Sequence, residues 1–196
     1  MPNDGWITEL AEVHLQTHDL HHRHVILNLC LINDVAFLRE VSRDWTEKRL
    51  RYDGQKPEFN WIAIYNFNVS ENAHAFAIKQ GSRTEAVMLV KDGHVVRCDR
   101  IHRPPAVYVS FVEVALWNRA DTPPELRLRG VGTAILRAAC DLSMQRGFYG
   151  RVGLHAIAAA EGFYRRLGFE AYDCPNEYNE IYYELSERGA EALLTD

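Results

Sequence analysis

The run Arg127-Leu128-Arg129-Gly130-Val131-Gly132-Thr133 lies between an apolar stretch that ends at Leu116 and a segment of helical periodicity that ends at Gly147. Two glycines one residue apart let the backbone come close to a ligand, and the N–H groups in the first turn of a helix attract an anion. The run therefore indicates a loop that holds phosphate groups. A tight turn into a helix is the alternative. No Gly-Lys-Ser/Thr follows, which excludes a Walker loop, and Ile135 replaces the third small residue of a dinucleotide fingerprint.

A second motif follows one predicted strand later. The segment Ala160-Glu161-Gly162-Phe163-Tyr164-Arg165-Arg166-Leu167-Gly168-Phe169 is typical of a short helix closed by a glycine. In this order the two motifs resemble the GNAT superfamily, the acetyl-CoA-dependent N-acetyltransferases. Members have an Arg/Gln-x-x-Gly-x-Gly/Ala loop and an Ala-x-x-Phe-Tyr-x-x-x-Gly-Phe helix. The resemblance is specific over residues 105–186, extends back to about residue 73, and gives no alignment for residues 1–72, which form a divergent N-terminal part.

The resemblance implies a role for each matching residue. Backbone amides from Leu128 to Thr133 would hold the CoA pyrophosphate, with Arg127 and Arg129 supplying charge, and the end of the preceding strand would hydrogen-bond the pantetheine arm. Tyr164 would act as the general acid that protonates the departing CoA thiolate. The implied cofactor-binding residues are Val114, Ala115, Leu116, Arg127, Leu128, Arg129, Gly130, Val131, Gly132 and Thr133.

The reaction also needs a base for the attacking amine, because a protonated amine has no lone pair. Glu113 is the carboxylate of the strand before the loop and is the predicted catalytic base. In a regular strand it faces away from Val112 and Val114, so it would need a bulge to point the same way. A structural or substrate-binding carboxylate is the alternative for Glu113. His155, at the end of the next strand, is a rival base, with a core or supporting histidine as its own alternative.

Two departures from the family pattern bear on the site. The excursion from Trp117 to Leu126 is longer than the few residues that the family usually has there, which leaves open which amides face the pantetheine. Many members carry a CoA-contacting asparagine after the following strand, whereas this chain has Ile157, Ala158 and Ala159.

The order of predicted elements indicates one α/β (mixed α+β) domain over residues 1–196, a mixed sheet with helices packed on it. The resemblance specifies a GNAT-like acyl-CoA N-acyltransferase fold with a splayed sheet. Asp92-Gly93, between two predicted strands, predicts a hairpin turn. Helices are predicted over residues 34–51, 131–147 and 159–167, and strands over residues 60–66, 74–79, 86–90, 94–98, 106–116, 151–156, 169–173 and 180–185.

Charge is distributed unevenly along the chain. The net charge of −5 argues against a basic nucleic-acid binder, yet residues 101–170 contain nine arginines and six acidic residues, and residues 171–196 contain one arginine and seven acidic residues. The arginine-rich part is where a bound anion is expected, and acidic surroundings elsewhere would suit a cationic amine acceptor. No apolar run is long enough for a membrane span, and the acidic start is unlike a secretory signal, so a cytoplasmic protein is expected.

Three further features carry weaker hypotheses. His14, His18 and His22 have an i, i+4 spacing that could bind a metal on a helix, but a solvated helix face is favoured and no metal is expected. The four widely spaced cysteines are expected to be reduced and mostly buried. Aromatic residues at 61–67 and 178–183 fit either the core or a substrate pocket.

The sequence thus predicts an N-acetyltransferase that uses acetyl-CoA as cosubstrate and transfers the acetyl group to a primary amine of a small molecule or protein by direct attack on the thioester. A homodimer is left open. Three alternatives remain: a catalytically silent CoA-binding module, an interaction protein on the same fold, and a toxin-type enzyme that acetylates aminoacyl-tRNA. The acidic composition disfavours the last.

Overall fold

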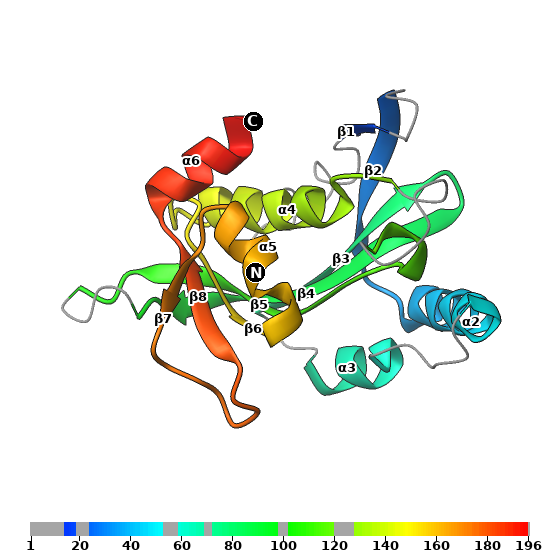
Figure 1. Ribbon diagram of the computed structural model, residues 1–196, viewed down its shortest axis with the longest axis horizontal. Coiled ribbons are helices and arrows are strands. Elements are labelled where there is room, and N and C mark those ends of the chain that lie inside the picture. Colours follow the sequence, from blue (N-terminus) through cyan, green and yellow to red (C-terminus); the bar gives the residue numbers. More distant parts are fainter. Residues whose placement is uncertain are drawn as a thin grey trace. The chain divides into compact units, whose positions relative to one another are not determined.

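The computed structural model describes residues 14–18, 24–52, 59–68, 72–97, 102–119 and 128–195 (Figure 1). These residues fall into two units. The first, here called the N-terminal unit, comprises residues 1–89 and 112–135, and the second, the C-terminal unit, comprises residues 90–111 and 136–196. Eight described strands form a mixed sheet in the order β1-β2-β3-β4-β5-β6-β8-β7. The predicted fold class, a mixed sheet flanked by helices, is confirmed.

The N-terminal unit begins with two strands that the sequence does not predict, β1 (His14–His18) and β2 (His24–Ile32). They pair antiparallel, and β2 pairs antiparallel with β3 (Ala73–Gln80), which places Leu29 opposite Ile78. Helix α2 (Val35–Tyr52) confirms the predicted helix, and the Asp34 carboxylate caps it by accepting the Ala36 N–H at 2.8 Å. Fully buried side chains of this unit include Leu27, Leu29, Leu38, Trp61, Phe76, Ile78 and Met88.

One strand prediction and one helix prediction in this part of the chain are wrong. Residues 60–66 form not a strand but helix α3 (Trp61–Asn68), whose first turn is capped by Asn60, because its side-chain oxygen accepts the Ala63 N–H at 3.1 Å. A short apolar run does not distinguish a strand from a helix, and here the capping asparagine decides. The helix predicted for the histidine segment is also wrong, since His14–His18 forms a strand. His22 lies outside the described residues.

The predicted hairpin at Asp92-Gly93 is wrong as well. Strand β4 (Arg83–Val95) continues through both residues and belongs to both units. Gly93 has a φ of +76°, so the glycine is needed for an irregularity inside a continuing strand, not for a reversal of the chain. Asp92 pairs instead with Arg146 at 2.8 Å. The chain turns back after β4, where the Val96 N–H donates to the Pro104 carbonyl.

The C-terminal unit follows the prediction closely. It contains part of β5 (Pro105–Val114), part of α4 (Val131–Gln145), β6 (Val152–Ala156), α5 (Glu161–Arg166), β7 (Glu170–Tyr172) and β8 (Ile181–Leu185). Gly147 and Gly168 end the two helices at φ values of +75° and +87°, which glycine adopts without strain. Helix α6 (Glu187–Thr195), which the sequence does not predict, is tied to α4 by the Arg137 side chain donating to the Leu193 carbonyl.

The pairing of β5 with β6 covers only part of the two strands. The two strands run parallel and pair over Val107–Val109 and Val152–Leu154. Strand β5 continues to Val114 and β6 to Ala156, and no pairing joins these further residues, all of which are described. The pairing therefore ends at Val109 and Leu154, and the splay of the sheet stays a prediction. On its other edge β6 pairs antiparallel with β8 throughout, with His155 opposite Tyr182.

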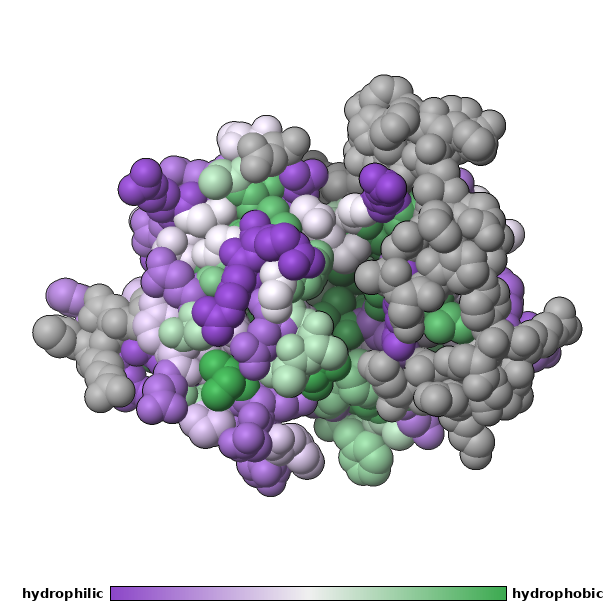
Figure 2. Space-filling model, viewed as in Figure 1, coloured by the Kyte–Doolittle hydropathy of each residue, from purple (hydrophilic) through white to green (hydrophobic). Residues whose placement is uncertain are grey.

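The described surface is largely hydrophilic near α5 and α6 (Figure 2), and the described cysteines are free thiols. No described helix is long and apolar enough to cross a membrane. Cys30, Cys140 and Cys174 are free thiols, and burial raises the pKa of the Cys140 thiol to about 12, so it is not a nucleophile near neutral pH. Cys98 lies outside the described residues.

Candidate active site

The loop that leads into α4 has the geometry of an anion-binding turn. Leu128 is buried, whereas Arg129 and Gly130 are exposed, and Gly130 adopts a φ of +79°. The Gly130 carbonyl accepts the Ala134 N–H at 2.8 Å and so begins the helical hydrogen bonding. The amides of the first turn of this 15-residue helix have no acceptor within the helix, and the helix dipole favours a negative charge there. Arg127 lies outside the described residues.

The Asn118 side chain connects this loop to strand β4 by hydrogen bonds. Its side-chain oxygen accepts the Leu128 N–H at 2.9 Å, and its amide group donates to Glu85 Oε2 at 2.7 Å. Glu85 is fully buried and also accepts a hydrogen bond from the Trp117 indole at 2.6 Å and from Arg83. Because every polar group in this chain of contacts is paired, the backbone at Leu128 is fixed to β4 through two side chains.

The end of β5 presents the residues predicted to meet the pantetheine. Val114 ends the strand, Ala115 is fully buried, and Leu116 begins a short 3-10 turn (Leu116–Asn118). The Ala115 N–H donates to the Glu85 carbonyl at 2.8 Å, so this amide points toward β4. Amides alternate between the two edges of a strand, and the Val114 amide therefore points to the opposite edge. The three residues remain predicted pantetheine contacts, with Val114 best oriented.

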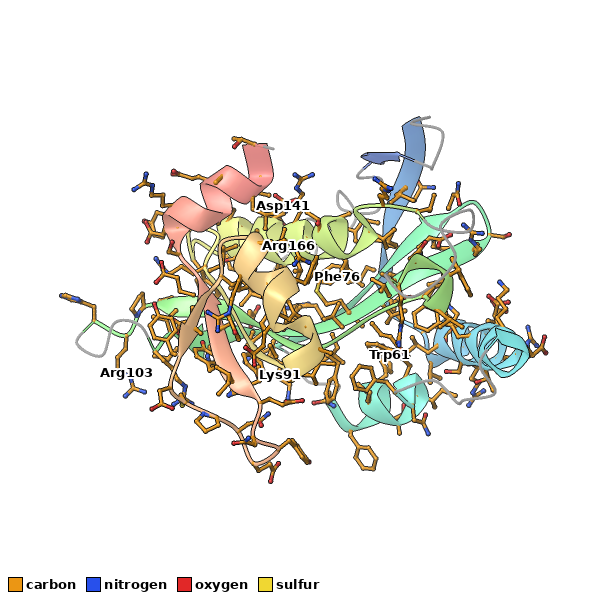
Figure 3. The ribbon with its side chains drawn as sticks, in the orientation of Figure 1. Trp61, Phe76, Lys91, Arg103, Asp141 and Arg166 are labelled. Atoms are coloured by element: carbon orange, nitrogen blue, oxygen red, sulfur yellow. The ribbon has the colours of Figure 1, made fainter. Side chains whose placement is uncertain are left out.

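Glu113 is the residue before the last one of β5, and its side chain is buried. The indole of Trp61, labelled in Figure 3, donates to Glu113 Oε2 at 2.9 Å, and Arg119 pairs with Oε1 at 3.0 Å. The side chain of Glu113 is 3% exposed and that of Arg119 is 19% exposed. Each carboxylate oxygen thus already accepts a hydrogen bond. The role of Glu113 as base stays a prediction, and these contacts favour the alternative of a carboxylate that positions Trp61 and Arg119.

Tyr164 is the predicted acid and lies on α5 among aromatic rings. The ring centroids of Phe163, Phe169 and Tyr183 are 5.4, 5.7 and 6.2 Å from that of Tyr164. Its side chain is 7% exposed, and burial, with a smaller effect of the Glu180 charge, raises the pKa of the phenol to about 12.

His155 belongs to a cluster of four rings in the C-terminal unit. Tyr108 of β5 and His155 of β6 are hydrogen-bonded through Oη and Nδ1 at 2.7 Å, and His94 of β4 and Tyr182 of β8 through Nε2 and Oη at 2.8 Å. Burial lowers the pKa of both histidines, to about 4 for His94, so both rings are neutral at pH 7. The sequence signals His155 and its strand position, but the pairing with Tyr108 depends on strand register.

Gly153 makes the cluster possible. It lies opposite Tyr108 on one side and Glu184 on the other. A Cβ atom at this position would overlap the Tyr182 hydroxyl and come within 3.1 Å of Cζ of the same ring. The Tyr182 ring therefore lies directly over the bare backbone of β6.

A mixed sheet flanked by helices, with a glycine-containing turn that leads into α4, has the architecture of an acyl-CoA-dependent transferase. Comparison with known proteins agrees: the family model described as "Acetyltransferase (GNAT) family" matches residues 36–169. The chain belongs to this family. A search of curated protein sequences gives no match.

Several solved structures have the same fold. An acetyltransferase from Thermus thermophilus matches with a TM-score of 0.52 and 14% identity, over 88% of this chain and 98% of that chain. The toxin AtaT, bound to the C-terminus of the antitoxin AtaR and acetyl-CoA, matches with a TM-score of 0.51 and 12% identity, over 87% and 99%. FeeM, an N-acyl amino acid synthase from uncultured soil microbes, matches with a TM-score of 0.53 and 12% identity, over 85% and 93%. Identities this low establish the fold alone.

Proposed function

We propose that this protein is an N-acetyltransferase that moves the acetyl group of acetyl-CoA to a primary amine by direct attack of the amine on the thioester. Family membership supports an acyl-CoA cosubstrate in general. The observation that carries the specific proposal is the turn from Leu128 to Thr133, where a positive-φ glycine precedes the first-turn amides of α4 and Asn118 fixes the loop. That turn suits the pyrophosphate of CoA.

The proposed reaction forms an N–C bond and breaks the S–C bond of the thioester, with the thiolate of CoA as leaving group. Tyr164 donates its proton to that sulfur. A phenol with a pKa of about 12 is a weak acid compared with a thiol in water. Burial raises the pKa of a thiol too, as the value of about 12 for Cys140 illustrates, so a thiolate released in a dry site is basic enough to take the proton.

Calorimetric titration with acetyl-CoA tests the cofactor part of the proposal. Wild type should bind, and Gly130→Glu should weaken binding at least tenfold, since it adds a negative charge and a side chain at a φ of +79°. Gly130→Ala controls for the backbone strain alone and should lose less. Absence of binding by wild type would refute the proposal and leave an interaction protein on this fold.

Release of free thiol tests the chemistry. Wild type and acetyl-CoA are mixed in turn with spermidine, cadaverine, tyramine, lysinamide and a short peptide with a free N-terminus. Faster thiol release with any of these amines, together with the acetylated product by mass spectrometry, supports the proposal. Binding of acetyl-CoA without thiol release in any mixture would instead identify a silent CoA-binding module.

A further inference from the structure

The four-ring cluster of His94, Tyr108, His155 and Tyr182 is a group of titratable side chains that the proposed reaction leaves without a role. Its rings form a closed arrangement, with centroid separations of 4.8 Å (His94 and Tyr108), 6.0 Å (Tyr108 and His155), 5.0 Å (His155 and Tyr182) and 5.7 Å (His94 and Tyr182). Tyr182 is fully buried, whereas the other three rings keep some exposure. The cluster is therefore ordered but accessible.

Strand register places these rings on one face of the sheet. Tyr108 pairs with Gly153, and His155 pairs with Tyr182. Glu180 immediately precedes β8, next to the pair that joins Ala156 with Ile181. Tyr183 projects to the opposite face from Tyr182, where it contacts Tyr164. Tyr108 and His155 thus share a face of the sheet, and Glu180 lies at the end of β8 that pairs with the last residue of β6.

The direction of the hydrogen bond between Tyr108 and His155 follows from the tautomer of the neutral His155 ring. The backbone of Cys174 favours a ring N–H that donates to it, which is the tautomer with the hydrogen on Nε2. In that tautomer Nδ1 is the acceptor and the Tyr108 hydroxyl is the donor. The oxygen of Tyr108 keeps a lone pair for a further donor, such as the nitrogen of an amine.

Glu180 links this pair electrostatically to the predicted acid. Its charge raises the pKa of Tyr108, of His155 and of Tyr164. The carboxylate is held in place, because Asn176 donates to Glu180 Oε2 at 2.6 Å. A carboxylate whose charge acts on a neutral proton acceptor is suited to attract an ammonium ion to that acceptor. The other charged groups near His155 are Arg97, which opposes its protonation, and Glu184, which lies beyond Tyr182 and accepts the Arg97 N–H.

We propose that Tyr108 and His155 form a two-step proton relay for the acceptor nitrogen, and that Glu180 beside them selects a cationic primary amine. The inference rests on the proposed function. The bound ammonium first loses one proton to solvent, because only the neutral amine has a lone pair with which to attack. As the nitrogen then bonds to the carbonyl carbon it becomes more acidic, and one of its remaining N–H bonds breaks as an O–H bond forms on Tyr108. The original Tyr108 proton passes to His155 Nδ1, so tyrosine stays neutral and the positive charge ends on the imidazole.

The relay is tested with the best amine of the panel above, at saturating acetyl-CoA, by the pH dependence of kcat/KM. Wild type should lose activity below pH 6.5 as His155 becomes protonated. His155→Asn places an acceptor oxygen near the position of Nδ1 but takes no proton, so kcat should fall about 100-fold and the acid limb should vanish. Tyr108→Phe should cause a similar fall. His102→Asn, at an exposed histidine of the same unit, is the matched control and should behave as wild type.

Two further readouts separate the relay from a structural role. The acetyl-CoA Kd, measured by calorimetry, should stay within about twofold in His155→Asn, an effect below 0.5 kcal/mol by the conversion of 1.4 kcal/mol per tenfold. Glu180→Gln should raise the KM of the amine and move the acid limb to lower pH, because the charge that favours protonated His155 is lost.

Each outcome is decisive. If no amine of the panel makes the wild type release thiol from acetyl-CoA, the proposed function and the relay are both overturned. If the wild type is active and His155→Asn keeps both its kcat and the loss of kcat/KM at acid pH, the relay alone is overturned. If His155→Asn does not fold, Tyr108→Phe decides in its place, since it keeps the ring and removes only the hydroxyl: full activity there refutes the relay.

Discussion

Asn118 and Leu128 are joined by a hydrogen bond of 2.9 Å that closes the base of the loop between the end of β5 and the start of α4. The same asparagine donates to the buried Glu85 carboxylate. The long excursion after Trp117, which departs from the usual family pattern, thus returns to a fixed point. The turn proposed to bind the pyrophosphate is thus held at Leu128 by a side chain that lies outside the turn itself.

Replacing Asn118 by alanine should loosen the turn without removing any of its amides. We expect the acetyl-CoA Kd to rise about tenfold, the equivalent of roughly 1.4 kcal/mol, while kcat at saturating acetyl-CoA changes little. Calorimetry and steady-state kinetics measure the two quantities. Asn68→Ala, which removes an asparagine bond to a backbone carbonyl within α3, is the matched control. An unchanged acetyl-CoA Kd in Asn118→Ala would show that the turn keeps its conformation without the Asn118 hydrogen bond.

The Glu113 and Arg119 pair should matter for stability more than for turnover. Arg119→Met leaves a buried carboxylate without its cation and should lower the free energy of unfolding by about 3 kcal/mol, measured by urea denaturation. Combining it with Glu113→Gln should cost less than the sum of the two single changes. Glu113→Gln should keep kcat within about tenfold; a fall of 100-fold or more with intact stability would make Glu113 the base after all.

Tyr164→Phe should lower kcat about 100-fold and leave the acetyl-CoA Kd unchanged, because the hydroxyl acts on charge that develops only during the reaction. Steady-state kinetics measure kcat, and calorimetry measures the acetyl-CoA Kd. A phenol pKa of about 12 keeps the proton in place as pH rises, so no alkaline loss of rate below that value should come from Tyr164. Tyr149→Phe, at a tyrosine that is 61% exposed, serves as control. Equal losses of kcat and affinity would point to packing.

Gly153→Ala should destabilise the protein by about 2 kcal/mol, since its methyl group would overlap the Tyr182 ring. Gly162→Ala is the contrasting control, because its Cβ would meet nothing closer than Arg166 at 3.5 Å inside a helix, where alanine should stabilise by about 0.5 kcal/mol. Thermal denaturation of both variants tests the pair. Equal effects of the two changes would contradict the packing seen at Tyr182.

The fold of the C-terminal unit was predictable because glycines mark where its elements end. Gly147 and Gly168 stop helices of clear period, and β6 and β8 are short apolar runs between such stops. The N-terminal unit offers weaker signals. The run from residue 60 to 66 has no period that separates helix from strand, and Asp92-Gly93 has the composition of a turn inside a strand that neighbouring strands keep extended.

The candidate site was predictable only where a motif carries it. The turn at Gly130 and the α5 tyrosine follow from local sequence, whereas Trp61 and Glu113 are 52 positions apart and Glu85 and Asn118 are 33 apart. No periodicity relates such residues, and only the packing of the strands brings them together. The same holds for Tyr108 and His155, whose contact depends on the parallel register of β5 and β6.

The bare backbone at Gly153 ties two positions of the chain to each other in evolution. As long as a tyrosine occupies position 182, a side chain at 153 is unfavourable, and a change at 153 becomes tolerable only after the ring above it has been lost. Loss of that ring also removes the hydrogen-bond partner of His94. A side chain at position 153 and the ring at position 182 therefore exclude each other, and a variant with a larger residue at 153 would also have to lose the contact between Tyr182 and His94.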